Sequence, residues 1–299
     1  MRWLVLAIPA LAGGSAAAPH HDRRIQQRIV QTDDGRPYRL SISKPDAPTP
    51  PAGFPLIVVL DGETYFASAA RSAAAFARSG ESVPVIVVGI SAESADSAET
   101  DRARMLDYTS AAPAELLPER VRREAIPTGG VLPFVTYLTD TLLPQVARSL
   151  PIHSRCRILF GHSLAGLAVL ESLAARPTSF STFVASSPSV WWGRGAVLTR
   201  LRQLPARGES DRPHVAITVG ALEQPTARMP AAGSEMKPDF RMIDNALAAF
   251  TVLKQKPQAT RPEFRILAGD DHAEAAGDAL IAAVRRAGEC GRPTAAGIP

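Results

Sequence analysis

Short apolar runs of strand length alternate along this chain with longer segments of helical periodicity. The runs are residues 55–60, 83–90, 158–160, 182–186, 214–219 and 264–267. The helical segments are residues 65–79, 132–150 with Pro144 inside it, 164–175, 242–253 and 273–287. A continuous apolar run suits a strand that is buried on both faces. The alternation therefore predicts the α/β class, with a mostly parallel central sheet and helices on both faces.

Two regions depart from this alternation. Residues 26–32 and 38–44 mix polar and apolar positions, and the Asp-Asp-Gly turn signal between them predicts an antiparallel hairpin at one edge of the sheet. Residues 91–130 lack a long apolar period. A long excursion after a strand of a parallel sheet lies at the edge where ligands bind, so we interpret this segment as part of a binding region.

The N-terminus has the outline of a secretory signal peptide. A positive Met1-Arg2 precedes an apolar stretch at residues 3–11 and small residues at 13–18. We expect cleavage after Ala17, which divides the chain into a signal peptide at residues 1–17 and a single domain at residues 18–299. A membrane anchor is the alternative, but the stretch is shorter than the roughly 18–20 residues that a span needs. We expect an exported, periplasmic protein without stable membrane insertion.

Composition narrows the function classes. The 299 residues are 45% hydrophobic and 21% charged, and the net charge of +4 is spread along the chain without a dense Lys/Arg block, so we expect no nucleic-acid partner. No phosphate-binding loop, dinucleotide fingerprint or zinc-ligand spacing occurs in the sequence, so we expect no cofactor and no metal. Cys156 and Cys290 either pair, as an oxidising compartment would allow, or are independent thiols.

The run at residues 158–160 ends in Gly161-His162-Ser163, and an Ala/Leu-rich helical pattern begins at once. A strand, a sharp turn bearing serine and a helix match the nucleophile elbow Gly-x-Ser-x-Gly of the α/β-hydrolases. The last motif position holds Ala165 in place of glycine, and Gly166 follows it. The alternative interpretation is a serine N-cap on a core helix.

A base and an acid follow Ser163 in the order that these hydrolases use. Glu223 follows the strand at residues 214–219, and His272 follows the strand at 264–267. Parallel strands would bring all three to one edge of the sheet, with His272 as base and Glu223 as the acid that orients it. Competing acids are Asp239, Asp244, Asp270 and Asp271. His162, beside the serine, is expected to shape the pocket.

An ester hydrolase also needs backbone N–H donors for the oxyanion of the tetrahedral intermediate. We expect one donor at Leu164, directly after the nucleophile. The second should come from Gly62 or Glu63, in the loop that follows the strand at residues 55–60.

Several strings occur together in order, and as a set they resemble the esterase D-like family of α/β-hydrolases. They are residues 60–66 (LDGETYF), 104–109 (RMLDYT), 161–164 (GHSL), 186–192 (SSPSVWW), 220–223 (GALE) and 269–272 (GDDH). The likeness is strongest to periplasmic siderophore esterases, which cut the trilactone of enterobactin-type compounds. It implies a serine esterase with Ser163 as nucleophile and His272 as base. Since some siderophore esterases manage with little help from an acid, it leaves the role of Glu223 open.

The resemblance implies a small-molecule ester substrate, which could be an iron-loaded catecholate siderophore. For such an anionic aromatic ligand, Arg104 would supply charge, and Tyr108, Trp191 and Trp192 would stack or make cation–π contacts. Alternatively, Arg104 pairs with Asp107 and the tryptophans pack against the core. The competing functions are a feruloyl- or acetyl-esterase, an S-formylglutathione hydrolase-like enzyme, or a catalytically silent binding protein with this fold.

Overall fold

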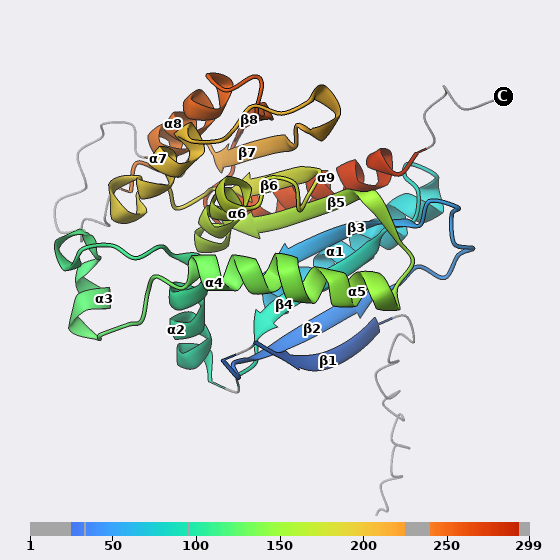
Figure 1. Cartoon of the computed structure of the whole chain (residues 1–299), viewed down its shortest axis with the longest axis horizontal. Coiled ribbons are helices and arrows are strands. Elements are labelled where there is room, and N and C mark those ends of the chain that lie inside the picture. The colour runs from blue at the N-terminus through green and yellow to red at the C-terminus, as the bar shows by residue number, and fades with distance from the viewer. Residues whose placement is uncertain (1–24, 33, 95, 225–239, 293–299) are drawn as a thin grey trace, which may run out of the picture.

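The computed structural model describes residues 25–32, 34–94, 96–224 and 240–292. Within these residues a single eight-stranded sheet has the order β1-β2-β4-β3-β5-β6-β7-β8 (Figure 1). The strands are β1 Ile25–Gln31, β2 Pro37–Ser43, β3 Phe54–Leu60, β4 Ile86–Ala92, β5 Ile152–His162, β6 Thr182–Ser186, β7 His214–Gly220 and β8 Arg261–Leu267. The expected signal peptide and Asp239 lie outside the described residues.

The pairing of the strands follows the predicted pattern. From β4 to β8 all neighbours run parallel, whereas β1 pairs with β2, and β2 with β4, in antiparallel register. Every residue of β3 is buried, as its unbroken apolar run predicts. The mostly parallel sheet and its antiparallel edge are therefore confirmed.

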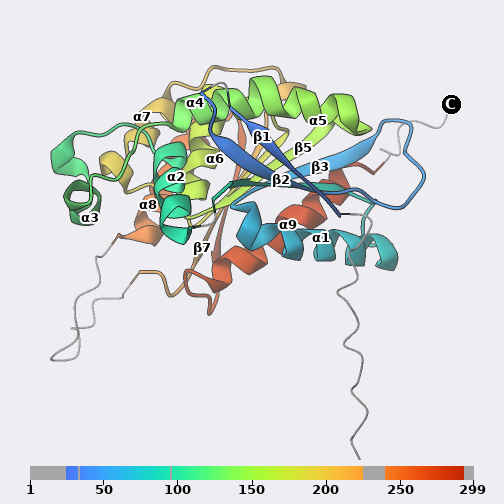
Figure 2. The ribbon, with the colours of Figure 1, turned by 90° about the horizontal axis from the view of Figure 1, so that it is seen from below.

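Helices cover both faces of the sheet (Figure 2). The long helices α1 (Gly62–Ser79) and α9 (Glu274–Cys290) pack on one face, against Ile57 and Val59 of β3. The opposite face carries Leu56 and Val58 and packs against a separate group of helices. That group is α2 Ser97–Tyr108, α4 Val131–Thr136, η2 Tyr137–Leu142, α5 Leu143–Ser149, α6 Leu164–Ala175, α7 Ala196–Arg202 and α8 Met242–Lys254. Alternate side chains of β3 therefore pack into two hydrophobic cores, one on each face of the sheet. No helix among the described residues is long and apolar enough to cross a membrane.

Short helices complete the connections: η1 Ala114–Leu116, α3 Glu119–Arg123, η3 Trp192–Arg194 and η4 Glu209–Asp211. The pattern at residues 91–130 did not predict α2, because α2 buries only Met105, Asp107 and Tyr108 at its C-terminal end. Pro144 does not break the helix at 131–149. It follows the π-helical turn η2, and such a turn accommodates an interruption of the regular hydrogen bonding.

Cys156 in the middle of β5 and Cys290 at the end of α9 form a disulfide, so the paired alternative holds. The bond joins residues 134 apart in sequence, and it ties the last helix to the strand that carries the elbow. Because it closes a long loop, it restricts the unfolded chain strongly.

We therefore expect the double variant Cys156→Ser/Cys290→Ser to lose about 2–5 kcal/mol of unfolding free energy. Urea unfolding of this variant and of the oxidised protein would measure the difference. Wild-type protein unfolded in the presence of a reductant is the control and should match the variant. Equal midpoints for oxidised protein and variant would contradict the expectation.

Candidate active site

Ser163 lies in the sharp turn between β5 and α6 with φ 59° and ψ −117°, a strained conformation for a residue with a side chain. Its N–H donates to the Ser186 carbonyl at 2.9 Å, and its carbonyl accepts from the Ser189 N–H at 3.1 Å. These contacts hold the turn in place and leave the Ser163 side chain half-buried. This geometry is that of a nucleophile elbow.

The elbow needs glycine at two close approaches. A Cβ on Gly161 would lie 2.4 Å from the Ala165 carbonyl oxygen, and a Cβ on Gly166 would lie 2.8 Å from the Ser186 carbonyl oxygen. Ala165 itself is fully buried without displacing the helix. The departure from the usual motif is thus accommodated, because Gly166 takes the position where α6 approaches β6.

His272 joins Ser163 to Glu223. Its Nε2 lies 3.1 Å from Ser163 Oγ, and its Nδ1 lies 2.6 Å from Glu223 Oε2. The three residues follow β5, β7 and β8, whose carboxyl ends meet at one edge of the sheet. The predicted grouping of serine, histidine and acid is therefore present, and in this geometry His272 can take a proton from Ser163.

The Glu223 carboxylate is the most enclosed member of this group, with 1% of its side chain exposed against 48% for His272. Its Oε1 accepts from the Gly220 N–H at 2.6 Å and from the Ser187 hydroxyl. Burial raises the pKa of Glu223, but the hydrogen bonds from His272, Ser187 and Gly220 outweigh it, so the net shift is downward. The carboxylate is therefore ionised where it faces the imidazole.

Two of the competing acids, Asp244 and Asp271, have other partners. Asp271 Oδ1 accepts from the N–H groups of Ala273 and Glu274 at the start of α9. Asp244 pairs with Arg241 at 2.6 Å. Of the acids described, Glu223 is therefore the one hydrogen-bonded to His272.

His162, which was expected to shape the pocket, lies behind His272. It is 5% exposed, its Nδ1 lies 3.0 Å from Ser186 Oγ, and its ring packs 4.5 Å from the His272 ring. Burial, together with the positive charge that His272 can carry, lowers the pKa of His162 to about 3. His162 is thus a neutral support behind the base.

The loop that should provide the second oxyanion donor favours Gly62. The Glu63 N–H already donates to Ser91 Oγ at 2.8 Å, which argues against Glu63 in that role. The next two N–H groups of α1, those of Thr64 and Tyr65, donate to the Asp61 carbonyl. A Cβ on Gly62 would lie 2.7 Å from the Ile90 nitrogen, so glycine is required where the loop turns into α1.

Arg104 and Tyr108 both form hydrogen bonds with Asp61, the residue before Gly62. Arg104 donates to both Asp61 carboxylate oxygens, at 2.7 and 2.8 Å, and Tyr108 Oη accepts from the Asp61 N–H at 3.3 Å. The alternative pairing of Arg104 with Asp107 is wrong, because Asp107 is bound by Arg36 and Tyr38. Tyr108 is 4% exposed and cannot stack on a substrate, so that prediction is corrected. Both side chains fix the loop from behind.

The two tryptophans have different environments. Trp192 is 1% exposed and donates from Nε1 to the Ser110 carbonyl at 2.8 Å, so its predicted contact with a substrate is wrong. Trp191 is half-buried and stacks on Phe240 with ring centroids 4.4 Å apart. Phe240 is 40% exposed and was missed, because a lone aromatic residue before a helix carries no functional signal in sequence.

Comparison with known proteins identifies the family of this chain. The family model described as "Putative esterase" matches residues 33–273. The chain belongs to this esterase family. Ferri-bacillibactin esterase BesA of Bacillus subtilis is 32% identical over 246 residues, covering 80% of this chain and 81% of that protein. The siderophore triacetylfusarinine C esterase of Aspergillus fumigatus is 29% identical, over 74% of this chain and 78% of that protein. Among solved structures, a siderophore hydrolase of Aspergillus nidulans superposes with a TM-score of 0.74 at 23% identity, over 96% and 99% of the two chains.

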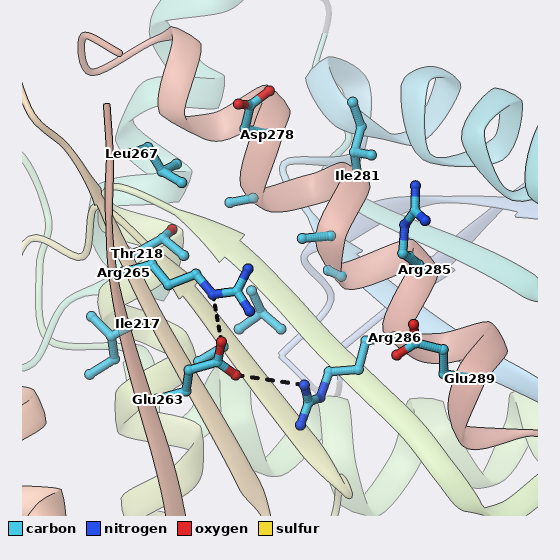
Figure 3. A pocket seen from close by; sticks show the side chains of 15 residues that line it. Ile217, Thr218, Glu263, Arg265, Leu267, Asp278, Ile281, Arg285, Arg286 and Glu289 are labelled. Atoms are coloured by element: carbon cyan, nitrogen blue, oxygen red, sulfur yellow. Dashed lines mark hydrogen bonds and ion pairs between the residues drawn. The ribbon is translucent and has the colours of Figure 1, made fainter. Parts of the chain in front are cut away.

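Membership of the esterase family makes the chain a carboxylic-ester hydrolase with the α/β-hydrolase fold. In the described part of the chain, no group of three or more His, Cys, Asp or Glu side chains is arranged to hold a metal ion. A cavity of about 470 Å³ lies between β7, β8 and α9 (Figure 3). Its charged rim is internally paired, since Glu263 contacts both Arg265 and Arg286. Its lining does not include Ser163, Glu223 or His272.

The lowered pKa of His162 predicts a pH-dependent contribution to stability. Between the ordinary pKa of 6.5 and about 3, the unfolded chain binds a proton at this residue and the folded esterase does not. The stability advantage of wild type over His162→Asn should therefore shrink by about 1.4 kcal/mol per unit as pH falls from 6 to 4. Urea unfolding of both proteins at each pH would measure it. A pH-independent difference would contradict the burial of a neutral imidazole.

Proposed function

We propose that this esterase cleaves ester bonds of a siderophore with Ser163 as nucleophile, His272 as general base and Glu223 as the orienting acid. The observation that carries the proposal is the hydrogen-bonded chain from Ser163 Oγ through His272 to Glu223. The siderophore substrate is supported by the relatives, among them the ferri-bacillibactin and triacetylfusarinine C esterases. A siderophore ester is the substrate class that these relatives support.

In the proposed reaction, Ser163 Oγ attacks the ester carbonyl while His272 Nε2 takes the hydroxyl proton. The tetrahedral intermediate collapses, and His272 returns the proton to the departing alkoxide, which leaves as an alcohol. Water then attacks the acyl-enzyme, with His272 again as base, and releases the carboxylic acid and free Ser163. Glu223 stabilises the imidazolium that forms in each step.

The oxyanion would be held by the N–H groups of Leu164 and Gly62. Leu164 begins α6, so its N–H lies at the positive end of that helix. Gly62 begins α1 directly after Asp61, and Arg104 donates two hydrogen bonds to the Asp61 carboxylate. Arg104 is thereby a positioning residue for the oxyanion loop.

Arg104→Gln should lower kcat by about 10- to 100-fold, because a shifted Gly62 N–H loses part of a contact worth about 10²–10³ in rate. The KM for a short p-nitrophenyl ester should change by less than about threefold, since this substrate does not depend on the Arg104 charge. Steady-state kinetics would separate the two effects, with Arg102→Gln, an exposed arginine on the same helix, as the control. A rise in KM at constant kcat would instead place Arg104 in substrate binding.

The substrate proposal is tested with the purified esterase and a panel of a catecholate trilactone, a hydroxamate ester siderophore, a feruloyl ester and a short acetyl ester. We expect the highest kcat/KM on a siderophore, and comparison of iron-loaded with iron-free ligand identifies the form that is cleaved. Faster cleavage of feruloyl or acetyl esters would move the protein to that alternative. Folded protein without activity on any of them would favour a silent binder.

We also propose export to the periplasm through residues 1–17. The positive, apolar and small-residue order of the N-terminus supports it, and the Cys156–Cys290 disulfide agrees with an oxidising compartment. N-terminal sequencing of protein recovered from the periplasm should begin at Ala18. An uncleaved Met1 in the cytoplasmic fraction would refute this proposal without affecting the catalytic one.

A further inference from the structure

A second, basic cavity lies at the edge of the sheet opposite Ser163. It measures about 250 Å³ and is formed where β5, β6, β7 and β8 begin, whereas the catalytic group lies where these strands end. Figure 1 shows β3, β5 and β7 pointing the same way, so the two edges are on opposite sides of the molecule. Four arginines line the cavity against one acidic residue, Asp211. They are Arg155, Arg157, Arg212 and Arg261.

The four arginines come together from separate parts of the chain. Arg155 and Arg157 are two apart on β5, so both side chains leave the same face of that strand. Arg212 lies two residues before the start of β7, and Arg261 begins β8 opposite His214. The sheet register therefore concentrates positive charge at this point.

Much of this charge is not matched by the described part of the protein. Arg155 and Arg157 make no side-chain hydrogen bond or ion pair with a described residue, and the Nε of Arg157 is buried without a partner. The Nε of Arg212 is also buried without a partner, although its Nη2 pairs with the highly exposed Glu209 at 3.3 Å. The Nη1 of Arg212 donates to the Pro257 carbonyl at 2.8 Å, and Arg261 donates to the Glu209 carbonyl. A guanidinium N–H that is buried without an acceptor is unfavourable, so the Nε groups of Arg157 and Arg212 favour an added acceptor at this cavity.

The excess positive charge of the arginines also affects two neighbouring histidines. Burial lowers the pKa of His153, and the charges of Arg155 and Arg157 lower it further. Burial likewise lowers the pKa of His214, followed by the charges of Arg286 and Arg261. The nearby imidazoles are thus kept neutral, and they do not offset the arginines.

Hydroxyl groups complete the lining, from Ser154, Thr178, Ser179, Ser181 and Ser210. The Ser181 hydroxyl is engaged by the Arg157 backbone, and Ser210 Oγ donates to Asp211. Guanidinium forks together with hydroxyl donors are the groups that proteins use to bind tetrahedral oxyanions. A carboxylate fits this set less well, because it offers two acceptor atoms to a cavity with donors on several sides.

We propose that this cavity binds a tetrahedral oxyanion, either inorganic phosphate or the phosphate monoester group of a larger molecule. The site is separate from the ester hydrolysis, because Arg155, Arg157 and Arg261 lie at the other edge of the sheet. Occupation would stabilise the fold by joining the starts of β5, β7 and β8 through one ligand.

The test titrates inorganic phosphate into the purified protein by calorimetry at low ionic strength. We expect saturable binding, weakened at least tenfold in Arg155→Gln/Arg157→Gln. The matched control is Arg28→Gln/Arg71→Gln, which removes the same charge from exposed positions on β1 and α1 and should bind as wild type does. Ester hydrolysis should be unchanged in both variants, which shows that each is folded.

Two sources of the oxyanion are separated by sedimentation with phosphatidic acid vesicles and with phosphatidylcholine vesicles. Phosphatidic acid binding that requires Arg155 and Arg157 would assign a lipid phosphate monoester, and phosphate binding alone would assign the free anion. An equal loss of phosphate affinity in both double variants would overturn the proposal, because net charge would then explain it. Wild-type protein without saturable phosphate binding would overturn it as well.

Discussion

Replacing Ser163 by alanine is expected to lower kcat for ester hydrolysis by about 10⁴- to 10⁶-fold. The reason is geometric: Ser163 Oγ lies 3.1 Å from His272 Nε2, and the strained turn presents it at the edge of the sheet where the strands end. The small side chain of alanine fits the same backbone, so the protein should fold and bind substrate. Steady-state kinetics of wild type and variant on a short p-nitrophenyl ester would measure the loss.

Ser189 provides the control for this variant. Its Oγ lies 3.5 Å from Ser163 Oγ, and it is 2% exposed, so it is the neighbouring hydroxyl that could replace the nucleophile. Ser189 supports the elbow through its backbone N–H, which donates to the Ser163 carbonyl, and this bond does not depend on the side chain. Ser189→Ala should therefore stay within about tenfold of wild type. A fluorophosphonate probe should label wild type and Ser189→Ala, but not Ser163→Ala. Labelled Ser163→Ala would show that another residue is the nucleophile.

The grouping of Ser163, Glu223 and His272 could be predicted from the sequence because its determinants are local. The elbow is contiguous in the chain, and Gly161, Ser163 and the start of α6 specify it within a few residues. Glu223 and His272 each directly follow a recognisable buried strand. Once the strands are parallel, their order along the chain brings them to one edge.

The surroundings of the site could not be predicted, because they depend on contacts between distant segments. Arg104 was assigned to substrate, yet it binds Asp61, which is 43 residues away in sequence. The two residues meet only because α2 packs against α4, α6 and β4. Trp192 and Tyr108 lie in segments without a clear apolar period, so the sequence does not tell whether each ring faces the core or the site. Phe240 meets Trp191 only after the chain has returned through β7.

The same reason explains which elements of the fold were missed. A helix is visible in sequence when one face is apolar along its whole length, as in α1 and α9. Helix α2 buries residues only in its last turn and is polar elsewhere, so no period marks it. Yet α2 carries Arg104 and Tyr108, which hydrogen-bond to Asp61 in the loop that we propose to bind the oxyanion. The element with the weakest signal therefore has a direct bearing on the site.

Glu223→Gln is expected to lower kcat by about 10³- to 10⁴-fold. In the wild type, Oε1 accepts from Gly220 and Ser187 while Oε2 accepts from His272 Nδ1. A glutamine that keeps its oxygen toward Gly220 and Ser187 must turn its NH₂ toward His272. Nδ1 then becomes an acceptor, and the ring proton moves to Nε2, which can no longer take the Ser163 proton.

Asp271→Asn is the matched control for this variant, since it makes the same carboxylate-to-amide change beside His272. Asp271 accepts hydrogen bonds from Ala273 and Glu274 and does not contact the imidazole, so activity should stay within about tenfold of wild type. A loss of less than tenfold in Glu223→Gln would show that Ser163 and His272 act as a dyad. A large loss confined to Glu223→Gln would establish the triad. Both variants change a carboxylate to an amide, but only the Glu223 carboxylate is hydrogen-bonded to His272 Nδ1.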